Sequence, residues 1–328
     1  MINSLYIYRT DKLDPFENLA REQVLLEDGP PFGVVLYLWQ NERTVVIGRN
    51  QNAFKECRVS LLEEEGGRLA RRLSGGGAVF HDKGNLNFTF VLPRSEFNVG
   101  RQTEVICRAC RAFGIPATIS GRNDLTVDGK KFSGNAFYKS GDRAYHHGTV
   151  LMNADKELVG RYLNPPTAKL KAKGVDSVRS RVINLCEIAP EISRDGLCRE
   201  LINAAREVYG LPAKELRFSQ KMEEKTKLLT ERYASKEWRF GSDTQATFNC
   251  EQTFLWGTVT LELTVDKGVI VHAAVFTDAM EWQLSECLKN ALEGLSFSRA
   301  AMLDGVAGAD LRPEIRDDLC RMLAQQEI

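Results

Sequence analysis

The sequence has no bias toward either sign of charge and no long apolar stretch. Among its 328 residues, 44 Lys and Arg balance 44 Asp and Glu, so no overall field draws the protein toward nucleic acid or an anionic membrane. No stretch approaches the ~18 apolar residues that a spanning helix needs, and the amino terminus lacks the basic region and apolar core of a secretion signal. We therefore expect a cytoplasmic protein that binds neither membrane nor nucleic acid.

The eight cysteines form no ligand pattern beyond a single CxxC pair, Cys107 and Cys110. This pair lies in residues 104–113, which have helical periodicity, and no second pair is nearby. Thiols in the cytosol are expected to stay reduced. We therefore predict two small residues packed on a helix, in preference to a redox or zinc site.

A chain of this length fits two domains better than one. Helices are predicted from Asp14-Pro15 to about residue 28 and at 102–113, 195–209 and 219–234, and short strands at 34–39, 44–48, 86–91 and 145–152. The turn-forming residue Asn41 lies between the first two of these strands, which predicts that they are neighbours. Strands and helices do not alternate strictly, so we expect a mixed α/β order.

Composition changes at residues 240–247, which are polar and separate the last of these helices from a new series of strands. We place a domain boundary there. Beyond it, strands are predicted at 254–265 and 269–276, joined by a turn at 266–268, followed by helices from about Trp282 and Pro313. This order predicts a small α/β module.

Three consecutive glycines, Gly75 to Gly77, follow the pair Arg71 and Arg72. Glycines suit neither helix nor strand, but without a Cβ their N–H groups can converge on a carboxylate or phosphate, to which an arginine adds charge-assisted bonds. The segment matches neither GxxxxGK[ST] nor GxGxxG. Taken alone, it fits a flexible surface loop as well as an anion site.

A second feature is the hairpin signal Asp128-Gly129 between two β-type runs. An alternation of period two predicts Lys131, Ser133 and Asn135 on one face, and Lys130 and Phe132 on the other. An exposed hairpin would present such a face to solvent. The oxygen atoms of Asn123 and Asp124 before the hairpin suit Mg²⁺, however, and a lysine near an acid and a glycine loop suits phosphoryl chemistry.

The adjacent residues His146 and His147 fall in a predicted strand and should point to opposite faces of it. They are therefore not expected to bind one metal together. At most one of them faces a cleft, and a structural histidine remains the alternative to a catalytic base.

Together these segments resemble the signature blocks of the lipoate-protein ligases, in the order found in that family. The blocks are Arg71-Arg72-Leu73-Ser74-Gly75-Gly76-Gly77-Ala78-Val79-Phe80-His81-Asp82-Lys83-Gly84-Asn85, Gly121-Arg122-Asn123-Asp124-Leu125, Lys130-Lys131-Phe132-Ser133-Gly134-Asn135-Ala136, His146-His147-Gly148-Thr149 and residues 173–185. The likeness continues through Phe254-Leu255-Trp256-Gly257 and Val275-Phe276-Thr277-Asp278, so it covers nearly the whole chain.

The resemblance implies an α+β fold: a mixed-sheet catalytic domain of the biotin and lipoate ligase type in residues 1–242, and a small α/β accessory domain in residues 247–328. It also implies an ATP-dependent enzyme. Lipoate or octanoate would react with ATP to give the acyl-AMP, and the acyl group would then pass to a lysine of a lipoyl domain.

The resemblance further assigns roles to residues. Lys131 would be catalytic and would contact both ATP and lipoate. The other ATP contacts would come from Arg72, Gly77, Ala78, Val79 and Phe80, and the other lipoate contacts from Ser74, Gly75, Gly76 and His147. Asp124 and Asn123 would hold Mg²⁺.

ATP and Mg²⁺ are thus expected as co-substrates, without a tightly bound prosthetic group. The expected acceptors are the lipoyl domains of 2-oxoacid dehydrogenase acyltransferase subunits and the glycine cleavage H protein. The alternative is a transferase that uses a preformed adenylate or an acyl-protein donor. The cysteine-nucleophile form of that alternative is disfavoured because no cysteine lies in the glycine segment, the hairpin or the histidine pair. Biotin ligation is disfavoured because its GRGR-type loop is replaced here by Ser74-Gly75-Gly76-Gly77.

Overall fold

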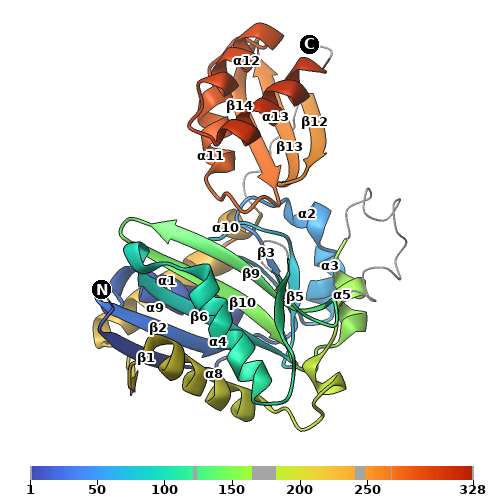
Figure 1. Cartoon of the computed structure of the whole chain (residues 1–328). Helices are drawn as coiled ribbons and strands as arrows, with labels where there is room; N and C mark the ends of the chain where they lie inside the picture. The colour runs from blue at the N-terminus through green and yellow to red at the C-terminus, as the bar shows by residue number, and fades with distance from the viewer. Residues whose placement is uncertain (1, 121–123, 165–181, 241–247, 267, 327–328) are drawn as a thin grey trace.

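The computed structural model describes residues 2–120, 124–164, 182–240, 248–266 and 268–326 (Figure 1). A large α/β body carries a smaller module built from the carboxy-terminal residues (Figure 1). None of the helices in these ranges is long and apolar enough to cross a membrane.

The body is organised around an eight-stranded mixed sheet in the order β11-β1-β2-β6-β10-β9-β8-β7. Its strands are β1 (Ser4–Arg9), β2 (Gly33–Trp39), β6 (Asn85–Pro93), β7 (Thr118–Ser120), β8 (Asp124–Val127), β9 (Lys130–Ser140), β10 (Arg143–Leu151) and β11 (Ala213–Glu215). β1 runs parallel to β2 and β11, and the remaining neighbours are antiparallel. The predicted mixed α/β fold is confirmed.

A separate three-stranded sheet has the order β4-β3-β5. It consists of β3 (Thr44–Ile47), β4 (Arg68–Arg71) and β5 (Val79–His81). The prediction that strands 34–39 and 44–48 are neighbours is therefore wrong, because β2 and β3 belong to different sheets. The reason lies at Asn41, which is fully buried and bonded to Asn18 and His81. The chain passes through the core at this residue instead of turning back at the surface.

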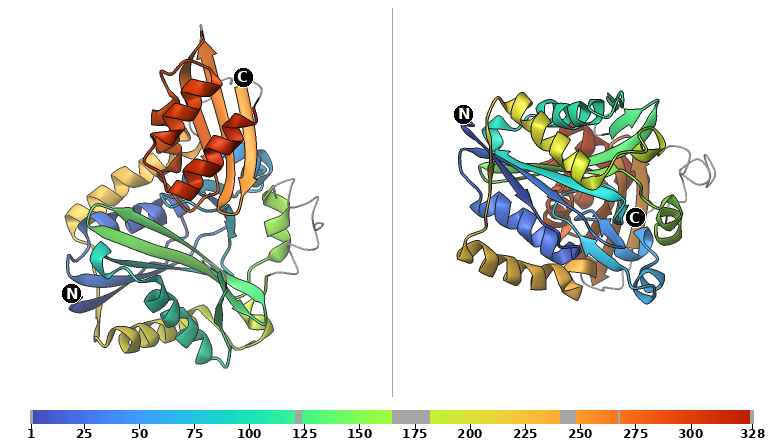
Figure 2. Two further views of the ribbon diagram at one scale, coloured as in Figure 1. Left: turned by 45° about the horizontal axis from the view of Figure 1, so that its top comes forward. Right: turned by 90° about the horizontal axis from the view of Figure 1, so that it is seen from below.

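Helices cover both faces of the large sheet (Figure 2). α4 (Val99–Arg111) and α8 (Arg194–Tyr209) pack on one face, and α1 (Pro15–Asp28) and α9 (Gln220–Ala234) on the other. The shorter helices are α2 (Ala53–Glu56), α3 (Val59–Glu64), α5 (Lys156–Tyr162) and α10 (Lys236–Phe240), with 3-10 turns at Arg94–Glu96 and Leu185–Glu187. The predicted long helices are confirmed to within a few residues.

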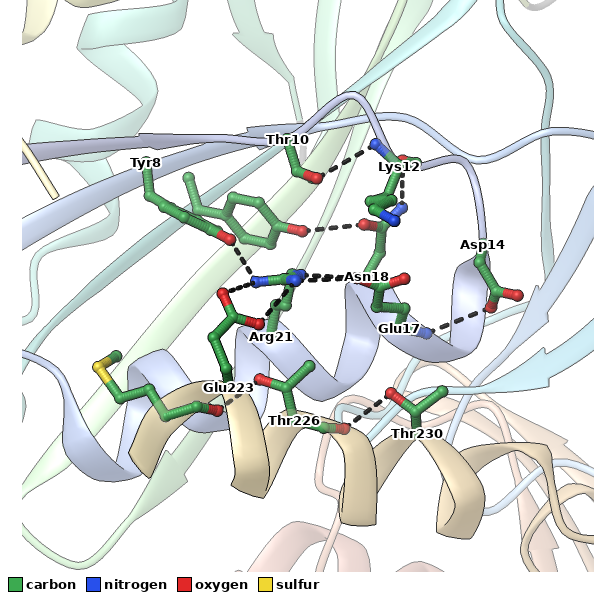
Figure 3. Close-up of polar contacts among 12 residues, drawn as sticks. Tyr8, Thr10, Lys12, Asp14, Glu17, Asn18, Arg21, Glu223, Thr226 and Thr230 are labelled. Atoms are coloured by element: carbon green, nitrogen blue, oxygen red, sulfur yellow. Dashed lines mark hydrogen bonds and ion pairs between the residues drawn. The ribbon is translucent and has the colours of Figure 1, made fainter. Parts of the chain in front are cut away.

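Helix α1 begins where the sequence predicts, because the Asp14 carboxylate accepts hydrogen bonds from the backbone N–H groups of Phe16 and Glu17. Arg21 on this helix lies between Glu17 and Glu223 of α9, with N–O distances of 2.8 and 3.0 Å (Figure 3). Polar contacts thus fix α1 against α9, so the face of α1 that points to the sheet has a set orientation.

The carboxy-terminal module has an antiparallel sheet of β12 (Phe248–Phe254), β13 (Gly257–Asp266) and β14 (Val269–Thr277). α11 (Leu284–Leu292), α12 (Arg299–Ala307) and α13 (Pro313–Ala324) pack on it and form a hydrophobic core of its own. The sequence missed β12 and α12 but predicted the small α/β character. The polar stretch that was expected to mark the boundary lies, apart from Phe240, outside the described residues.

Candidate active site

The glycine loop, residues 71–77, is folded around the side chain of Arg72. The Arg72 guanidinium donates to the carbonyl oxygens of Gly75 and Gly77 at 2.7 and 2.8 Å and to the Ser74 hydroxyl at 3.0 Å. Arg72 is 5% exposed. Burial lowers its pKa to about 10, so it remains protonated at neutral pH. The expected contact between Arg72 and ATP stays a prediction, because the hydrogen bonds described for its guanidinium all go to other residues of the protein.

Arg71 has a different surrounding. Among the described residues, its guanidinium donates to backbone carbonyls, including those of Arg49 at 2.8 Å, Gln51 at 2.6 Å and Arg239 at 2.7 Å. Burial lowers its pKa to about 10. Arg71 therefore ties the loop to residues 48–51 and to helix α10, and we assign it a structural role.

The carboxy-terminal module contacts the glycine loop directly. The Gly76 N–H donates to the Ala279 carbonyl at 3.0 Å, and a Cβ on Gly75 would lie 2.3 Å from that oxygen. Asn50 also bonds to the module. Its backbone carbonyl accepts from the Thr277 N–H at 2.8 Å, and its side-chain amide donates to the Trp282 carbonyl at 2.8 Å. The Gly76 N–H is therefore bonded to the module here, and the convergence of the loop N–H groups on an anion stays a prediction.

Arg49 reinforces this contact. Its guanidinium carbon lies 5.6 Å from the ring centre of Trp238 on α10 and 5.4 Å from that of Trp282 in the module. Such cation–π contacts are worth about 0.5–1 kcal/mol at exposed sites. Trp282 also packs against Tyr138 of β9, with ring centres 4.8 Å apart. Side chains of both modules thus meet beside the loop.

Lys131 is the second residue of β9, the second strand of the predicted hairpin. Asp128 and Gly129 have φ values of 50° and 74°, as a tight two-residue turn requires. The Lys131 Nζ lies 2.8 Å from Asp124 Oδ1, and both side chains are partly exposed. The end of the Lys131 side chain also lies over Gly134, where a Cβ would be 3.0 Å from Nζ. The hairpin thus places a cation beside an acid, as predicted, with room left by a glycine.

The predicted polar face of this hairpin is wrong. Leu125 pairs with Ser133 but Thr126 pairs with Lys131, so Phe132 is an extra residue that forms a β-bulge. Gly134 therefore shares the face of Lys131, and Asn135 points to the opposite face. There Asn135 Oδ1 lies 2.9 Å from Nε2 of His146.

The two histidines point to opposite faces, as predicted. His146 is fully buried between Asn135 and Gln102 of α4, and burial lowers its pKa to about 3. It is therefore a neutral structural histidine. His147 faces α1, where its Nδ1 lies 2.9 Å from Glu22 Oε1 and its Nε2 lies 2.8 Å from Ser74 Oγ.

Glu22 was missed by the sequence reasoning. It is 2% exposed and also accepts a 2.7 Å bond from Thr89, whose hydroxyl accepts from Trp39 Nε1 at 3.1 Å. A buried chain of hydrogen bonds thus runs from Trp39 to the Ser74 of the glycine loop. A signal was present: Glu22 lies at helical spacing between the apolar residues Leu19 and Leu26, so it falls on the buried stripe of α1.

The remaining ATP-site residues follow the loop along the chain. Ala78 leads into β5, which carries Val79 and Phe80 and forms an edge of the small sheet. As an edge strand, β5 pairs within this sheet with β3 on one side. The Phe80 ring itself packs against Tyr162, with ring centres 5.4 Å apart, so only the backbone of Phe80 suits a phosphate.

The described part of the chain contains no group of three or more His, Cys, Asp or Glu side chains that could hold a metal ion. Asp124 therefore belongs to no such group, and its role as a magnesium ligand stays a prediction. Asn123 lies outside the described residues, as do residues 173–181 of the last signature block. Cys107 and Cys110 are buried on α4 with free thiols, and burial raises the pKa of Cys110 to about 12. The predicted packing role of this pair is confirmed.

Comparison with known proteins agrees with this geometry. A family model described as the lipoyl protein ligase A/B catalytic domain matches residues 14–206, and one described as the bacterial lipoate protein ligase C-terminus matches residues 243–322. Lipoate-protein ligase A of Psychrobacter cryohalolentis is 40% identical over 303 residues, which cover 90% of this chain and 89% of that protein.

Two solved structures are also similar. The crystal structure of LipL1 of P. falciparum in complex with lipoate has a TM-score of 0.83 at 26% identity, covering 98% of this chain and 99% of that one. The bipartite lipoate protein ligase of Thermoplasma acidophilum, described with its E2 lipoyl domain, has a TM-score of 0.66 at 26% identity, covering 76% and 100%. The chain therefore belongs to the lipoate-protein ligase family, with a catalytic domain of the lipoyl protein ligase A/B type.

Proposed function

We propose that this enzyme activates lipoate, or octanoate, with ATP and transfers the acyl group to a lysine of a lipoyl domain. In the first step a carboxylate oxygen bonds to the α-phosphorus of ATP and pyrophosphate leaves. In the second, the lysine amine bonds to the acyl carbon, AMP leaves and the amine loses a proton. The observation that carries the proposal is the position of Lys131, partly exposed and beside Gly134 and Asp124, in a chain of this family.

Lys131 would perform two tasks in this reaction. Its ammonium attracts the carboxylate, and it then offsets the negative charge that develops at the α-phosphate, a preorganised stabilisation that costs no reorganisation at the moment of reaction. Arg72 keeps the glycine loop in shape through its bonds to Gly75 and Gly77, which leaves the amides of Gly77 and Ala78 for phosphate oxygens.

Ser74 and His147 would line the acyl pocket. Their bonds to each other and to Glu22 fix the orientation of all three side chains, so the pocket wall is rigid.

Magnesium would enter with ATP. Mg²⁺ takes oxygen ligands and is commonly held by one or two carboxylates together with substrate phosphates, which matches the single carboxylate of Asp124. With Asn123 as a second ligand, the ion would neutralise phosphate charge. In this state Asp124 would exchange its contact with Lys131 for the metal, leaving the lysine free for the acyl phosphate.

We further propose that residues 1–242 form the catalytic domain and residues 247–328 an accessory domain. The separate hydrophobic cores of the two modules support this division. The acceptor would be a lipoyl domain, of a 2-oxoacid dehydrogenase acyltransferase subunit or the glycine cleavage H protein. The similar ligase of Thermoplasma acidophilum, which is described together with its E2 lipoyl domain, supports an acceptor of this kind.

The deciding experiment is lipoate-dependent exchange of radiolabelled pyrophosphate into ATP. The proposal requires exchange with lipoate and none without acid. Transfer from supplied lipoyl-AMP in the absence of exchange would instead identify a pure transferase, and exchange dependent on biotin would identify a different ligase.

A further inference from the structure

One row of residues crosses the large sheet from the catalytic lysine to a tryptophan. Lys131 lies over Gly134 on β9, whose N–H donates to Thr149 Oγ1 at 3.2 Å. Thr149 pairs with Asn87 on β6, which in turn pairs with Trp39 on β2. Strands are ~4.8 Å apart, so three steps span about 14 Å. An extended acyl chain held at Lys131 by its carboxylate would thus end near Asn87 and Trp39.

The ring of His81 lies beside this end, 6.2 Å from the Trp39 ring. Its protonation follows from a chain of bonds that leads from Asn18 on α1 through Asn41 to His81. Of these three residues, Asn18 is labelled in Figure 3. The Asn18 amide nitrogen donates to two backbone carbonyls and to Asn41 Oδ1, so Asn41 must present its NH₂ group to His81 Nδ1, 3.2 Å away. His81 Nδ1 is therefore an acceptor.

Burial and the charge of Arg72 lower the pKa of His81 to about 3, so the ring is neutral. A neutral ring that accepts at Nδ1 carries its proton on Nε2. This Nε2–H is buried and has no hydrogen-bond partner in the described part of the chain. It is thus a fixed donor that awaits an acceptor.

Two asparagines add to this polar end. The side-chain amides of Asn85 and Asn87 share one hydrogen bond of 2.9 Å, and both residues are at most 1% exposed. Whichever way the two amides are oriented, one N–H group and one carbonyl of the pair remain without a partner within the described residues. Buried polar groups are normally paired, so these atoms call for a partner that the protein itself does not supply.

We propose that His81, Asn85 and Asn87 form a polar end wall of the acyl pocket, which selects carboxylic acids with a hydrogen-bonding atom at the far end over plain hydrocarbon acids of equal length. This inference rests on the proposed function and names its substrate class. A hydrocarbon tail would exclude water from the polar atoms of this wall without offering them a hydrogen bond. Sites built to hydrogen-bond a substrate reject analogues that lack the polar atom. A ring sulfur is a weak acceptor, and a hydroxyl a strong one.

The test compares kcat/KM for octanoate, 8-hydroxyoctanoate and lipoate in pyrophosphate exchange by the full-length enzyme. We expect 8-hydroxyoctanoate to be used at least tenfold more efficiently than octanoate, with lipoate also preferred to octanoate. In Asn87→Leu, which replaces the amide by an apolar group of similar size, this ratio should fall about tenfold. KM for ATP should not change.

The matched control is Gln102→Leu. Gln102 is also a fully buried amide, but it lies on α4 and contacts His146 on the other face of the sheet. It should leave the ratio of the acids as in the wild type. If the wild-type enzyme uses 8-hydroxyoctanoate and octanoate with nearly equal kcat/KM, the inference is overturned while the ligase assignment remains intact. This comparison requires no variant. A ratio that Asn87→Leu leaves unchanged would overturn it as well. The absence of pyrophosphate exchange with all three acids would overturn both the inference and the proposed function.

Discussion

We expect replacement of Lys131 by alanine to impair catalysis in this enzyme without a large effect on stability. The only described partner of the Lys131 ammonium is Asp124, and the side chains are 40% and 37% exposed. An exposed pair of this kind contributes about 0–1 kcal/mol to folding. We therefore expect Lys131→Ala to shift the free energy of unfolding by no more than about 1 kcal/mol.

The expected effect on the reaction is much larger. Loss of one preorganised donor at a developing negative charge costs about 2.7–4 kcal/mol in comparable enzymes, or a 10²- to 10³-fold lower rate. Because Lys131 is also expected to contact the carboxylate before reaction, the loss in adenylate formation should reach at least this range.

The assay is single-turnover formation of lipoyl-AMP, measured alongside urea unfolding of the same preparations. Lys130→Ala is the matched control, because Lys130 is the adjacent lysine, is exposed, and projects to the other side of the strand. It should keep the wild-type rate. A Lys131→Ala enzyme within about threefold of the wild-type rate would refute the assigned role, and a large loss of stability would refute the reasoning from exposure.

Two further predictions concern the module contact and the buried histidines. Gly75→Ala should push the carboxy-terminal module off the glycine loop, since its Cβ would lie 2.3 Å from the Ala279 carbonyl, whereas a Cβ at Gly77 meets nothing within 4 Å. Small-angle scattering should report a larger radius of gyration for Gly75→Ala than for the wild type, and no increase for Gly77→Ala. A Gly75→Ala radius equal to that of the wild type would contradict the contact. His81 and His146 have pKa values lowered to about 3, so below pH 6.5 only the unfolded chain gains their protons, and stability must fall as the pH is lowered. Each contributes up to ~1.4 kcal/mol per pH unit, and urea unfolding that is equally stable at pH 7 and pH 5 would contradict the assignment.

Local signals allowed much of the fold to be predicted. The cap at Asp14 and the turn at Asp128-Gly129 depend on a few neighbouring residues, and both occur as expected. The separation of β2 and β3 into different sheets was missed because it depends on burial of Asn41, whose partners Asn18 and His81 are distant in sequence. Patterns of period 2 and 3.6 contain no information about such contacts.

The candidate site was predicted in its residues more than in its geometry. Lys131 and Asp124 were expected together and do form a pair. The bulge at Phe132 was not predictable, because one extra residue in a strand leaves the alternation of the sequence unchanged while it moves Asn135 to the other face. Glu22 was overlooked because it lies 125 positions from His147, and only the folded sheet brings them within 2.9 Å.

The contacts of Arg49 with Trp238 and Trp282 allow the docking of the two modules to be followed by tryptophan fluorescence. One indole belongs to each module, and the Arg49 guanidinium contacts both rings in the docked state. If the modules separate during turnover, Trp282 loses its contacts with Arg49 and Tyr138, and its fluorescence should move toward longer wavelengths. The unlabelled enzyme thus carries its own optical reporter at the joint, and stopped-flow recording could time each separation against the formation of product.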